Sequence, residues 1–268
     1  MGEQNVVHKT SGPITKQTLI DDLKRIGVQK GDYLMVHSSL SSLGWVCGGE
    51  QAVVEALLEV VTEEGSIIMS TQSSNNSDPT YWENPPVPED WHEVIRNQMP
   101  AYHPALTSTR GMGRIVESFR THPDVIRSAH PKLSFAAYGN VAQSLIDNHS
   151  INLPFGEESP LARLYERNSK ILLLGVDYDS CTAMHLAEYR LGTLPVNQQG
   201  SAMMEDGQRV WKVYEEFDVD SDQFPAIGRA FEEKGKGAYG IVGMAETKLL
   251  PLKELVDFTL EYLQKSTK

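Results

Sequence analysis

The sequence has few cysteines, few basic residues and no long hydrophobic run. Only two cysteines, Cys47 and Cys181, occur in 268 residues, so a disulfide framework is excluded and a cytoplasmic location is expected. No apolar stretch is long enough to cross a bilayer, and the first residues lack the apolar segment of a signal peptide, so no membrane partner is expected. Lysine and arginine number 24 against 36 acidic residues, a formal net charge of −12. This excess of acid argues against nucleic-acid binding and favours a cationic small-molecule partner.

Many sequence motifs of common enzymes are also missing. There is no Walker-type phosphate loop, no HExxH, no paired CxxC and no GxSxG, and no cluster has metal-ligand spacing, so no metal site is predicted. Residues 235–240, GKGAYG, do match the dinucleotide pattern GxGxxG. Here a helix precedes the pattern and a strand follows it, whereas the fingerprint needs the opposite order. We therefore interpret this segment as a helix end followed by a turn.

Hydrophobic periodicity predicts an alternation of helices and strands. Helices are predicted at residues 18–26, 50–65, 113–120, 141–149, 160–168, 182–192 and 224–235, and strands at 33–37, 66–71, 132–139, 170–176, 209–214 and about 239–243. Pro251 is expected to open an amphipathic C-terminal helix. Residues 72–104 show no regular period, and an irregular segment of this length is often functional. The order of elements favours a layered α/β architecture in a single domain, residues 1–268.

Two loops are candidate anion sites. HSSL at residues 37–40 follows the predicted strand 33–37, and ligands of α/β sheets collect at such strand ends. Small residues there can direct backbone N–H groups at an anion, and an ordinary serine-rich turn is the alternative. TRGMG at residues 109–113 precedes a predicted helix and places Arg110 beside its N-terminus. A plain helix start, with no ligand, is the alternative for this second loop.

The predicted helix 182–192 carries a histidine and a carboxylate on one face. His185 and Glu188 are three residues apart and therefore share that face. A neighbouring carboxylate favours the protonated form of an imidazole, which suits a base that takes a proton from an attacking amine. From the residues alone, the pair fits a buried structural His–Glu hydrogen bond, and a general base with its carboxylate partner is the alternative.

The residues just before this pair raise two further hypotheses. Asp179 or Ser180 can cap the helix that follows. Cys181 precedes His185 by about one helical turn, so the two can form a Cys–His nucleophile pair. A lone cysteine at this position also fits the role of a small core residue.

Residues 77–93, SDPTYWENPPVPEDWHE, contain five carboxylates and no lysine or arginine. Carboxylates interleaved with tyrosine and tryptophan can hold a polyamine or amino sugar through ion pairs and ring stacking. A solvated acidic loop is the alternative. We take Asp78, Tyr81 and Glu83, together with Asp179, as the candidate acceptor-binding residues.

Several segments together resemble the aminoglycoside 3-N-acetyltransferase family, and within it the Bacillus-type, YokD-like branch. The segments, in the order that the family has them, are VHSSLSSLG (36–44), RGMG (110–113), SAHPKLSFAAYG (128–139), GEESPLARLYE (156–166) and GVDYDSCTAMHLAEYR (175–190). The resemblance runs from about Thr18 to at least Arg190. It implies a three-layer α/β/α sandwich around a mixed sheet, an α/β fold distinct from the GNAT fold.

The resemblance also implies a reaction, which is acetyl transfer from acetyl-CoA to the 3-amino group of a 2-deoxystreptamine antibiotic or a related amine, conferring resistance. His185 matches the family's general base and Glu188 its carboxylate partner. The expected coenzyme A contacts are His37, Ser38, Ser39, Leu40, Thr109, Arg110, Met112, Gly113, Ser134 and Phe135. We expect no metal and no nucleic acid, and we allow for a homodimer.

Two other functions remain open from the residues. A Cys181-dependent acyltransferase or hydrolase would work by a ping-pong mechanism and carry the acyl group on the thiol. A non-catalytic protein would bind coenzyme A or cationic ligands and release no thiol from acetyl-CoA.

Overall fold

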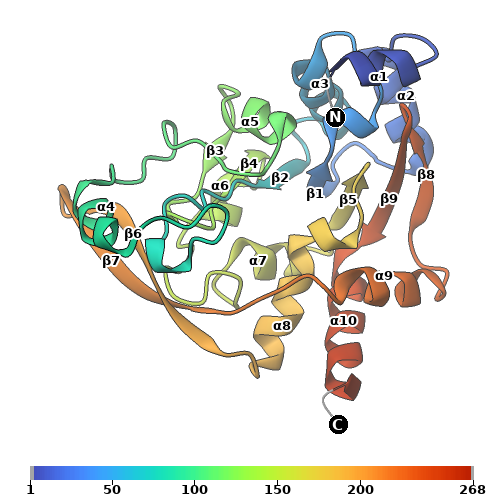
Figure 1. Cartoon of the computed structure of the whole chain (residues 1–268). Coiled ribbons are helices and arrows are strands. Elements are labelled where there is room, and N and C mark those ends of the chain that lie inside the picture. The colour runs from blue at the N-terminus through green and yellow to red at the C-terminus, as the bar shows by residue number, and fades with distance from the viewer. Residues whose placement is uncertain (1–2, 267–268) are drawn as a thin grey trace.

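The computed structural model describes residues 3–266, and a seven-stranded sheet runs through it (Figure 1). The strand order is β3-β4-β2-β1-β5-β9-β8. The strands are β1 (Tyr33–Ser38), β2 (Ser66–Ser70), β3 (Ile126–Arg127), β4 (Phe135–Gly139), β5 (Lys170–Leu174), β8 (Ala238–Val242) and β9 (Ala245–Pro251). β1 pairs in parallel with β2 and β5, and the other neighbours pair antiparallel. The sheet is therefore mixed, as predicted.

Helices cover both faces of this sheet, because successive strand side chains point to opposite sides. Leu34 of β1 and Leu172 of β5 belong to one hydrophobic cluster, whereas Met35 and Ile171 belong to the other. The first cluster includes side chains of α2 (Lys16–Ile26), α3 (Gly49–Val61) and α5 (Arg114–Arg120). The second includes side chains of α6 (Ala142–Ile146), α7 (Pro160–Glu166), α8 (His185–Leu191), α9 (Phe224–Glu232) and α10 (Leu252–Ser266). The α/β/α sandwich is confirmed.

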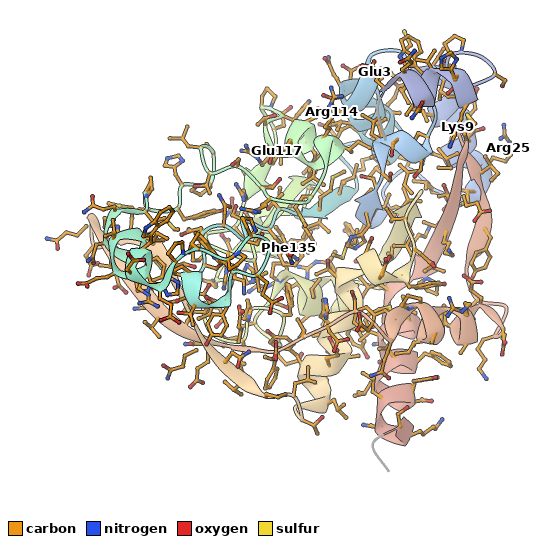
Figure 2. The ribbon with its side chains drawn as sticks, viewed as in Figure 1. Glu3, Lys9, Arg25, Arg114, Glu117 and Phe135 are labelled. Carbon is orange, nitrogen blue, oxygen red and sulfur yellow. The ribbon has the colours of Figure 1, made fainter. Side chains whose placement is uncertain are left out.

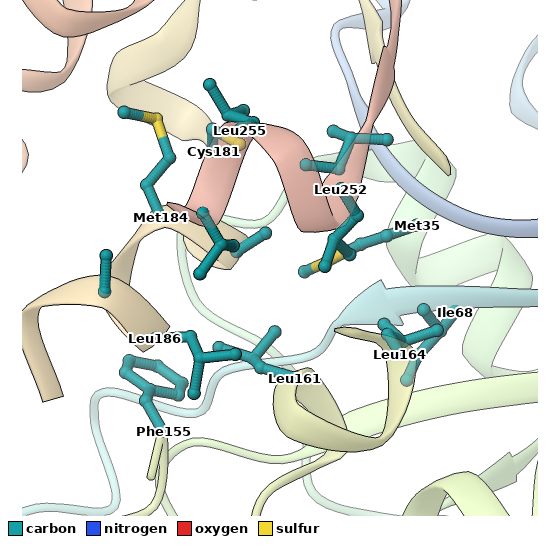
Figure 3. Close-up of a cluster of buried hydrophobic side chains, with 14 of the residues drawn as sticks. Met35, Ile68, Phe155, Leu161, Leu164, Cys181, Met184, Leu186, Leu252 and Leu255 are labelled. Carbon is teal, nitrogen blue, oxygen red and sulfur yellow. The ribbon is translucent and has the colours of Figure 1, made fainter. Parts of the chain in front are cut away.

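Figure 3 shows the second cluster from close by. Met35 of β1 lies beside Leu252 of α10, Ile68 of β2 lies beside Leu164 of α7, and Leu186 of α8 belongs to the same cluster. All five side chains are fully buried. α8, the helix that carries His185, is thus anchored by its apolar face, and its polar face is held in a fixed position.

A second, two-stranded sheet stands apart from the sandwich (Figure 1). Its strands β6 (Val196–Glu205) and β7 (Gln208–Phe217) form a long hairpin. The segment 72–104 lies against it, since the Tyr102 N–H donates to the Ala202 carbonyl and the Asn76 amide contacts the same residue. This segment contains two short 3₁₀ turns (Pro79–Tyr81 and Glu89–Trp91) and helix α4 (His92–Gln98). The expectation of a wholly irregular segment was wrong at these places.

Several other predictions needed correction. Strands β3, β6 and β9 and helix α1 (Glu3–Lys9) were not predicted. Pro251 ends β9 and does not open the last helix, which begins at Leu252. The helix predicted at 50–65 ends at Val61. The GKGAYG segment follows α9, turns at Gly235 and Gly237, which have positive φ, and enters β8 at Ala238, so the predicted order of helix end, turn and strand is confirmed. Within residues 3–266, no helix is long and apolar enough to span a bilayer.

Candidate active site

A cavity of about 810 Å³ opens where three parallel strands end. β1, β2 and β5 run in the same direction, so their carboxyl ends meet at one edge of the sheet. Its lining residues are drawn from 36–41, 44–50, 70–72, 111–116 and 176–185, with Glu3 and Val6 of α1. Figure 2 shows Glu3 and Arg114 at the end of the molecule that holds the N-terminal helices. The fold therefore brings together the N-terminal helix and segments near residues 40, 70, 113 and 180, which are far apart in sequence.

His185 and Glu188 form a close pair at this cavity. His185 lines the cavity, and its Nδ1 lies 2.5 Å from Oε2 of Glu188. Their side chains are only 14% and 9% exposed, so bulk water weakens the contact little. With Nδ1–H donating to the carboxylate, Nε2 is the ring nitrogen left with a lone pair. The arrangement can accept a proton at Nε2 and stabilise the resulting imidazolium.

The helix that carries this pair begins later than predicted. The chain after β5 makes two 3₁₀ turns, Tyr178–Ser180 and Thr182–Met184, before α8 starts at His185. Asp179 and Ser180 lie inside the first turn and do not cap the helix, so the capping prediction was wrong. The extra turns place Asp179 and Ser180 in the wall of the cavity, on the same side as His185.

The HSSL loop lies at the inner end of the cavity. His37, Ser38, Ser39 and Leu40 all line it, at the carboxyl end of β1. His37 is 8% exposed, and its Nε2 has no hydrogen-bond partner among the described residues. The Oγ of Ser38 is buried and unpartnered in the same way. Burial, reinforced by the electrostatic effect of His185, lowers the pKa of His37 to about 4, so the imidazole is neutral near pH 7.

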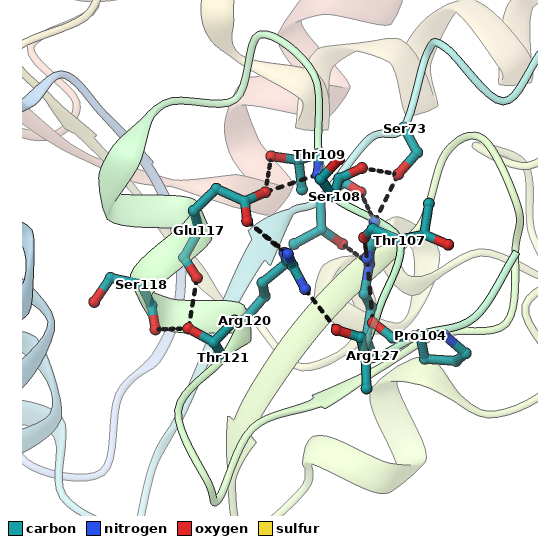
Figure 4. A network of polar contacts seen from close by, with 12 residues as sticks. Ser73, Pro104, Thr107, Ser108, Thr109, Glu117, Ser118, Arg120, Thr121 and Arg127 are labelled. Carbon is teal, nitrogen blue, oxygen red and sulfur yellow. Dashed lines mark hydrogen bonds and ion pairs between the residues drawn. The ribbon is translucent and has the colours of Figure 1, made fainter.

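The 109–113 loop forms another wall of the cavity and is held by hydrogen bonds from behind (Figure 4). The carboxylate of Glu117 accepts from both the backbone N–H (2.7 Å) and the hydroxyl of Thr109. Its other oxygen accepts from Nε of Arg120 at 2.8 Å. Met112 and Gly113 line the cavity, whereas Thr109 does not. Arg110 points to a different cavity, where its Nη2 donates to the Asn84 carbonyl.

Ser134 and Phe135 lie away from the cavity, in the interior. The Ser134 hydroxyl donates to the Thr71 carbonyl at 2.8 Å and is fully buried. Phe135 is also fully buried and packs edge-on against Phe155 (Figure 2). Arg127 bonds to Ser134 and to the carbonyls of the 104–107 segment, so this interior network supports the loop that leads to residues 109–113. The structure thus does not bring these two predicted coenzyme A contacts to the cavity.

The acidic segment forms a smaller cavity of about 500 Å³. Tyr81 and Glu83 line it, together with the cations Arg110 and Lys132. Asp78 does not line it, because its carboxylate accepts from Arg96 at 2.8 and 2.9 Å. Burial would raise the pKa of the Asp78 carboxyl, but the Arg96 guanidinium and the Thr80 N–H together hold it below its usual value. The sequence segment has no basic residue, yet α4 supplies one from just beyond it.

Cys181 is packed in the interior and does not line the cavity. Its side chain is 1% exposed within the cluster that includes Met184 and Leu255 (Figure 3). Burial raises the pKa of this thiol to about 12. The thiolate is the nucleophilic form of cysteine, so the geometry contradicts the hypothesis of a Cys181–His185 nucleophile pair.

Sequence reasoning missed the glycine-rich wall at residues 44–50. Gly44, Gly48 and Gly49 line the cavity and adopt positive φ. A Cβ at Gly44 would lie 2.8 Å from the sulfur of Met244, so a larger residue there is disfavoured. The sequence signal was present, since GWVCGGE places two glycines directly before a predicted helix. Ser70 and Thr182, which share a 3.1 Å hydrogen bond at the cavity, carried no recognisable signal.

The chain is similar to several known proteins in both sequence and fold. Residues 35–264 match the family described as Aminoglycoside 3-N-acetyltransferase. The chain is 48% identical, over 95% of its length and 94% of the relative, to the SPbeta prophage-derived aminoglycoside N(3')-acetyltransferase-like protein YokD of Bacillus subtilis (strain 168). The crystal structure of YokD superposes with a TM-score of 0.95, covering 97% of each chain.

Two solved structures with ligands are also similar. AAC-IIIb in a binary complex with CoASH has a TM-score of 0.84 at 27% identity, over 95% of this chain and 98% of that one. AAC-VIa bound to sisomicin has a TM-score of 0.85 at 30% identity, over 95% and 99%.

Proposed function

This chain is an enzyme of the aminoglycoside 3-N-acetyltransferase family, and we propose that it transfers the acetyl group of acetyl-CoA to an amine. The acceptor is the 3-amino group of a 2-deoxystreptamine aminoglycoside or a related amine, and the cellular consequence is resistance. The observation that carries the proposal is the His185–Glu188 pair, 2.5 Å apart, in the wall of a cavity of about 810 Å³.

The proposed reaction is direct transfer, with His185 as the general base. Nε2 of His185 takes a proton as the amine attacks the thioester carbonyl, and the negative charge of Glu188 stabilises the imidazolium that forms. The C–N bond forms, the C–S bond breaks, and the imidazolium returns the proton to the departing thiolate. Holding base, amine and thioester in one cavity supplies much of the rate enhancement.

The cavity suits the pantetheine arm and phosphates of acetyl-CoA. Its walls offer backbone N–H groups at the HSSL loop and at the N-terminus of α3, a 13-residue helix whose first residue is Gly49. Arg114 supplies a cation, although it is paired with Glu50 at 2.9 Å in this structure. AAC-IIIb, whose structure is similar, was solved with CoASH. We propose the backbone of the HSSL loop, with Met112 and Gly113, as the contacts for the cofactor substrate.

Asp179 is the carboxylate that we propose for binding the acceptor. It lines the cavity close in sequence to His185, and its Oδ1 accepts only a 3.3 Å contact from the neighbouring Ser180 among the described hydrogen bonds. Tyr81 and Glu83 line the smaller cavity together with Ser74, Asn75 and Arg110, and we propose that they contact a distal ring of a large acceptor. Asp78 is less suited, because Arg96 neutralises it. AAC-VIa, which is similar in structure, was solved with sisomicin.

A thiol-release assay tests the proposal directly. The chain is incubated with acetyl-CoA and a panel of aminoglycosides and simple amines, and free coenzyme A is measured with a thiol reagent. We expect release that depends on the acceptor and a product that is heavier by one acetyl group. Binding of coenzyme A or an aminoglycoside without thiol release from any acceptor would support a non-catalytic binder instead.

A further inference from the structure

We propose that His37 is a second catalytic residue, whose neutral imidazole donates a hydrogen bond to the thioester oxygen as negative charge develops there. This assignment rests on the proposed acetyl transfer and adds to it the group that stabilises the oxyanion. The geometry behind it is a buried, unpartnered imidazole at the carboxyl end of β1, in the wall of the cavity that also holds His185.

The first argument is the missing partner. Nε2 of His37 is shielded from water and makes no hydrogen bond to any residue that the structure describes. Buried polar side-chain atoms in proteins are nearly always paired, and each exception calls for an explanation. An apolar side chain of similar size would fill the same position without leaving a polar atom unpaired. The imidazole is thus poorly explained by a role in stability.

A second buried histidine in this chain shows the contrasting case. His130 is 1% exposed, and both of its ring nitrogens are used. Nδ1 accepts from the Leu133 N–H at 2.9 Å, and Nε2 lies 3.3 Å from the Ile151 carbonyl oxygen. His130 therefore fastens the backbone around it, as a structural histidine does. Nε2 of His37, in contrast, holds none of the described residues, and His37 is one of the residues that line the cavity.

The third argument is the charge state. Burial and the proximity of His185 lower the pKa of His37 to about 4, so His37 stays neutral when His185 becomes an imidazolium. The two histidines therefore have different roles, because His185 transfers the proton while His37 keeps its own proton and donates a hydrogen bond. A preorganised neutral donor in a water-poor cavity is well suited to stabilise an oxyanion. Hydrogen bonds of this kind are commonly incomplete in ligand-free enzymes and tighten in the reacting complex.

A role for His37 in stabilising the oxyanion leaves the bonds and protons of the acetyl transfer balanced. The amine nitrogen bonds to the carbonyl carbon, and the electron pair of the C=O bond moves onto the oxygen that His37 contacts. When the pair returns, the C–S bond breaks and the thiolate leaves with the proton that His185 had taken. His37 gains and loses no proton.

The test compares His37→Met, His37→Gln and His130→Met in the full chain, with kcat from thiol release, Kd for coenzyme A from calorimetry and Tm from thermal unfolding. For His37→Met we expect kcat to fall on the order of 10²-fold, with an unchanged Kd and a Tm equal to or above that of the wild type. His37→Gln keeps an N–H donor and should recover part of the lost kcat. His130→Met, the matched control, should lower Tm and leave kcat per folded molecule unchanged.

The outcomes separate the two proposals. If the wild-type chain releases no thiol with any acceptor, the acetyl transfer fails and the role of His37 falls with it. If the wild type is active and His37→Met matches its kcat, only the role of His37 is overturned. A lower Tm for His37→Met, with kcat per folded molecule retained, would likewise assign the residue to the fold and overturn the proposal.

Discussion

The imidazole of His185 is stacked on the ring of Phe155, with the ring centroids 5.4 Å apart and the planes only 5° from parallel. Phe224 contacts the imidazole from another side, at 4.9 Å and 53°. With Nδ1 held by Glu188, the ring has little freedom to turn. A base held in this way needs no reorganisation before it accepts a proton, which is the preorganisation on which catalysis depends.

The proposed roles of His185 and Glu188 predict two losses of activity of different size. His185→Ala removes the base, so we expect kcat to fall on the order of 10³-fold. Glu188→Gln keeps the shape but loses the charge that stabilises the imidazolium, and a loss on the order of 10²-fold or more is expected. Both variants should still bind coenzyme A in calorimetry. Near-normal turnover by His185→Ala would remove this residue from the mechanism.

The buried position of Cys181 predicts that its thiol is dispensable for the chemistry. We expect Cys181→Ala to keep kcat and to lose about 1–2 kcal/mol of unfolding free energy from the small cavity that it leaves. Mass spectrometry of the wild type after incubation with acetyl-CoA alone should show no acetyl adduct on the protein. Acetylation at Cys181, together with an inactive Cys181→Ala variant, would instead support the ping-pong mechanism.

The contacts of Glu117 predict an effect on cofactor binding rather than on the chemical step. Glu117→Ala removes the acceptor for the Thr109 N–H and hydroxyl, so the 109–113 loop should loosen. We expect KM for acetyl-CoA to rise by roughly 3- to 10-fold, or about 1 kcal/mol, with kcat nearly constant. Ser118→Ala, one residue along the same helix, is the control. An unchanged KM would show that this network does not position the loop.

The close packing of α9 on the turn beside the active site predicts a large steric effect. A Cβ at Gly228 would lie 2.1 Å from Cδ2 of Tyr178, whose neighbours Asp179 and Ser180 line the cavity. Alanine is the better helix former by about 1 kcal/mol, but we expect the clash to outweigh this and to lower stability by about 2–3 kcal/mol. Ala226→Gly, on the exposed face of α9, should cost only about 1 kcal/mol. Thermal unfolding of Gly228→Ala and Ala226→Gly measures both losses of stability, and a smaller loss for Gly228→Ala would contradict the predicted clash.

Buried neutral histidines predict a loss of stability in mild acid. The pKa of His37 is about 4 in the folded chain, against an unperturbed 6.5. Between these values the unfolded chain binds the additional proton, so stability is fully present above pH 6.5 and is lost as the pH falls toward 4. The total for His37 is about 3 kcal/mol, and burial shifts the pKa of His130 in the same direction. Urea unfolding across this range should show the slope, and His37→Met should flatten it; equal slopes for both proteins would contradict the burial of a neutral His37.

Elements that depend on local pattern were predictable. The short continuous apolar runs in YLMVH and KILLL identified β1 and β5, and the three-residue spacing of His185 and Glu188 placed them on one face. β6 and β9 were missed because their sequences, VNQQGSAMME and AETKLLP, show no clear apolar alternation; β6 is held by its hairpin partner β7, and β9 by the adjacent β8 and the remote β5. Strand propensity depends on such context more than helix propensity does.

The sequence of this protein determined which segments form the layers and which end of each parallel strand carries polar residues, because backbone geometry links side-chain direction to position along the chain. Only the tertiary structure decided which of those polar residues meet. It brought His37 and His185 to one cavity, buried Cys181, and paired Asp78 with Arg96, which lies just past the end of the acidic segment. These outcomes depend on contacts between residues that are remote in sequence and on the water that those contacts exclude, and neither can be read from local spacing.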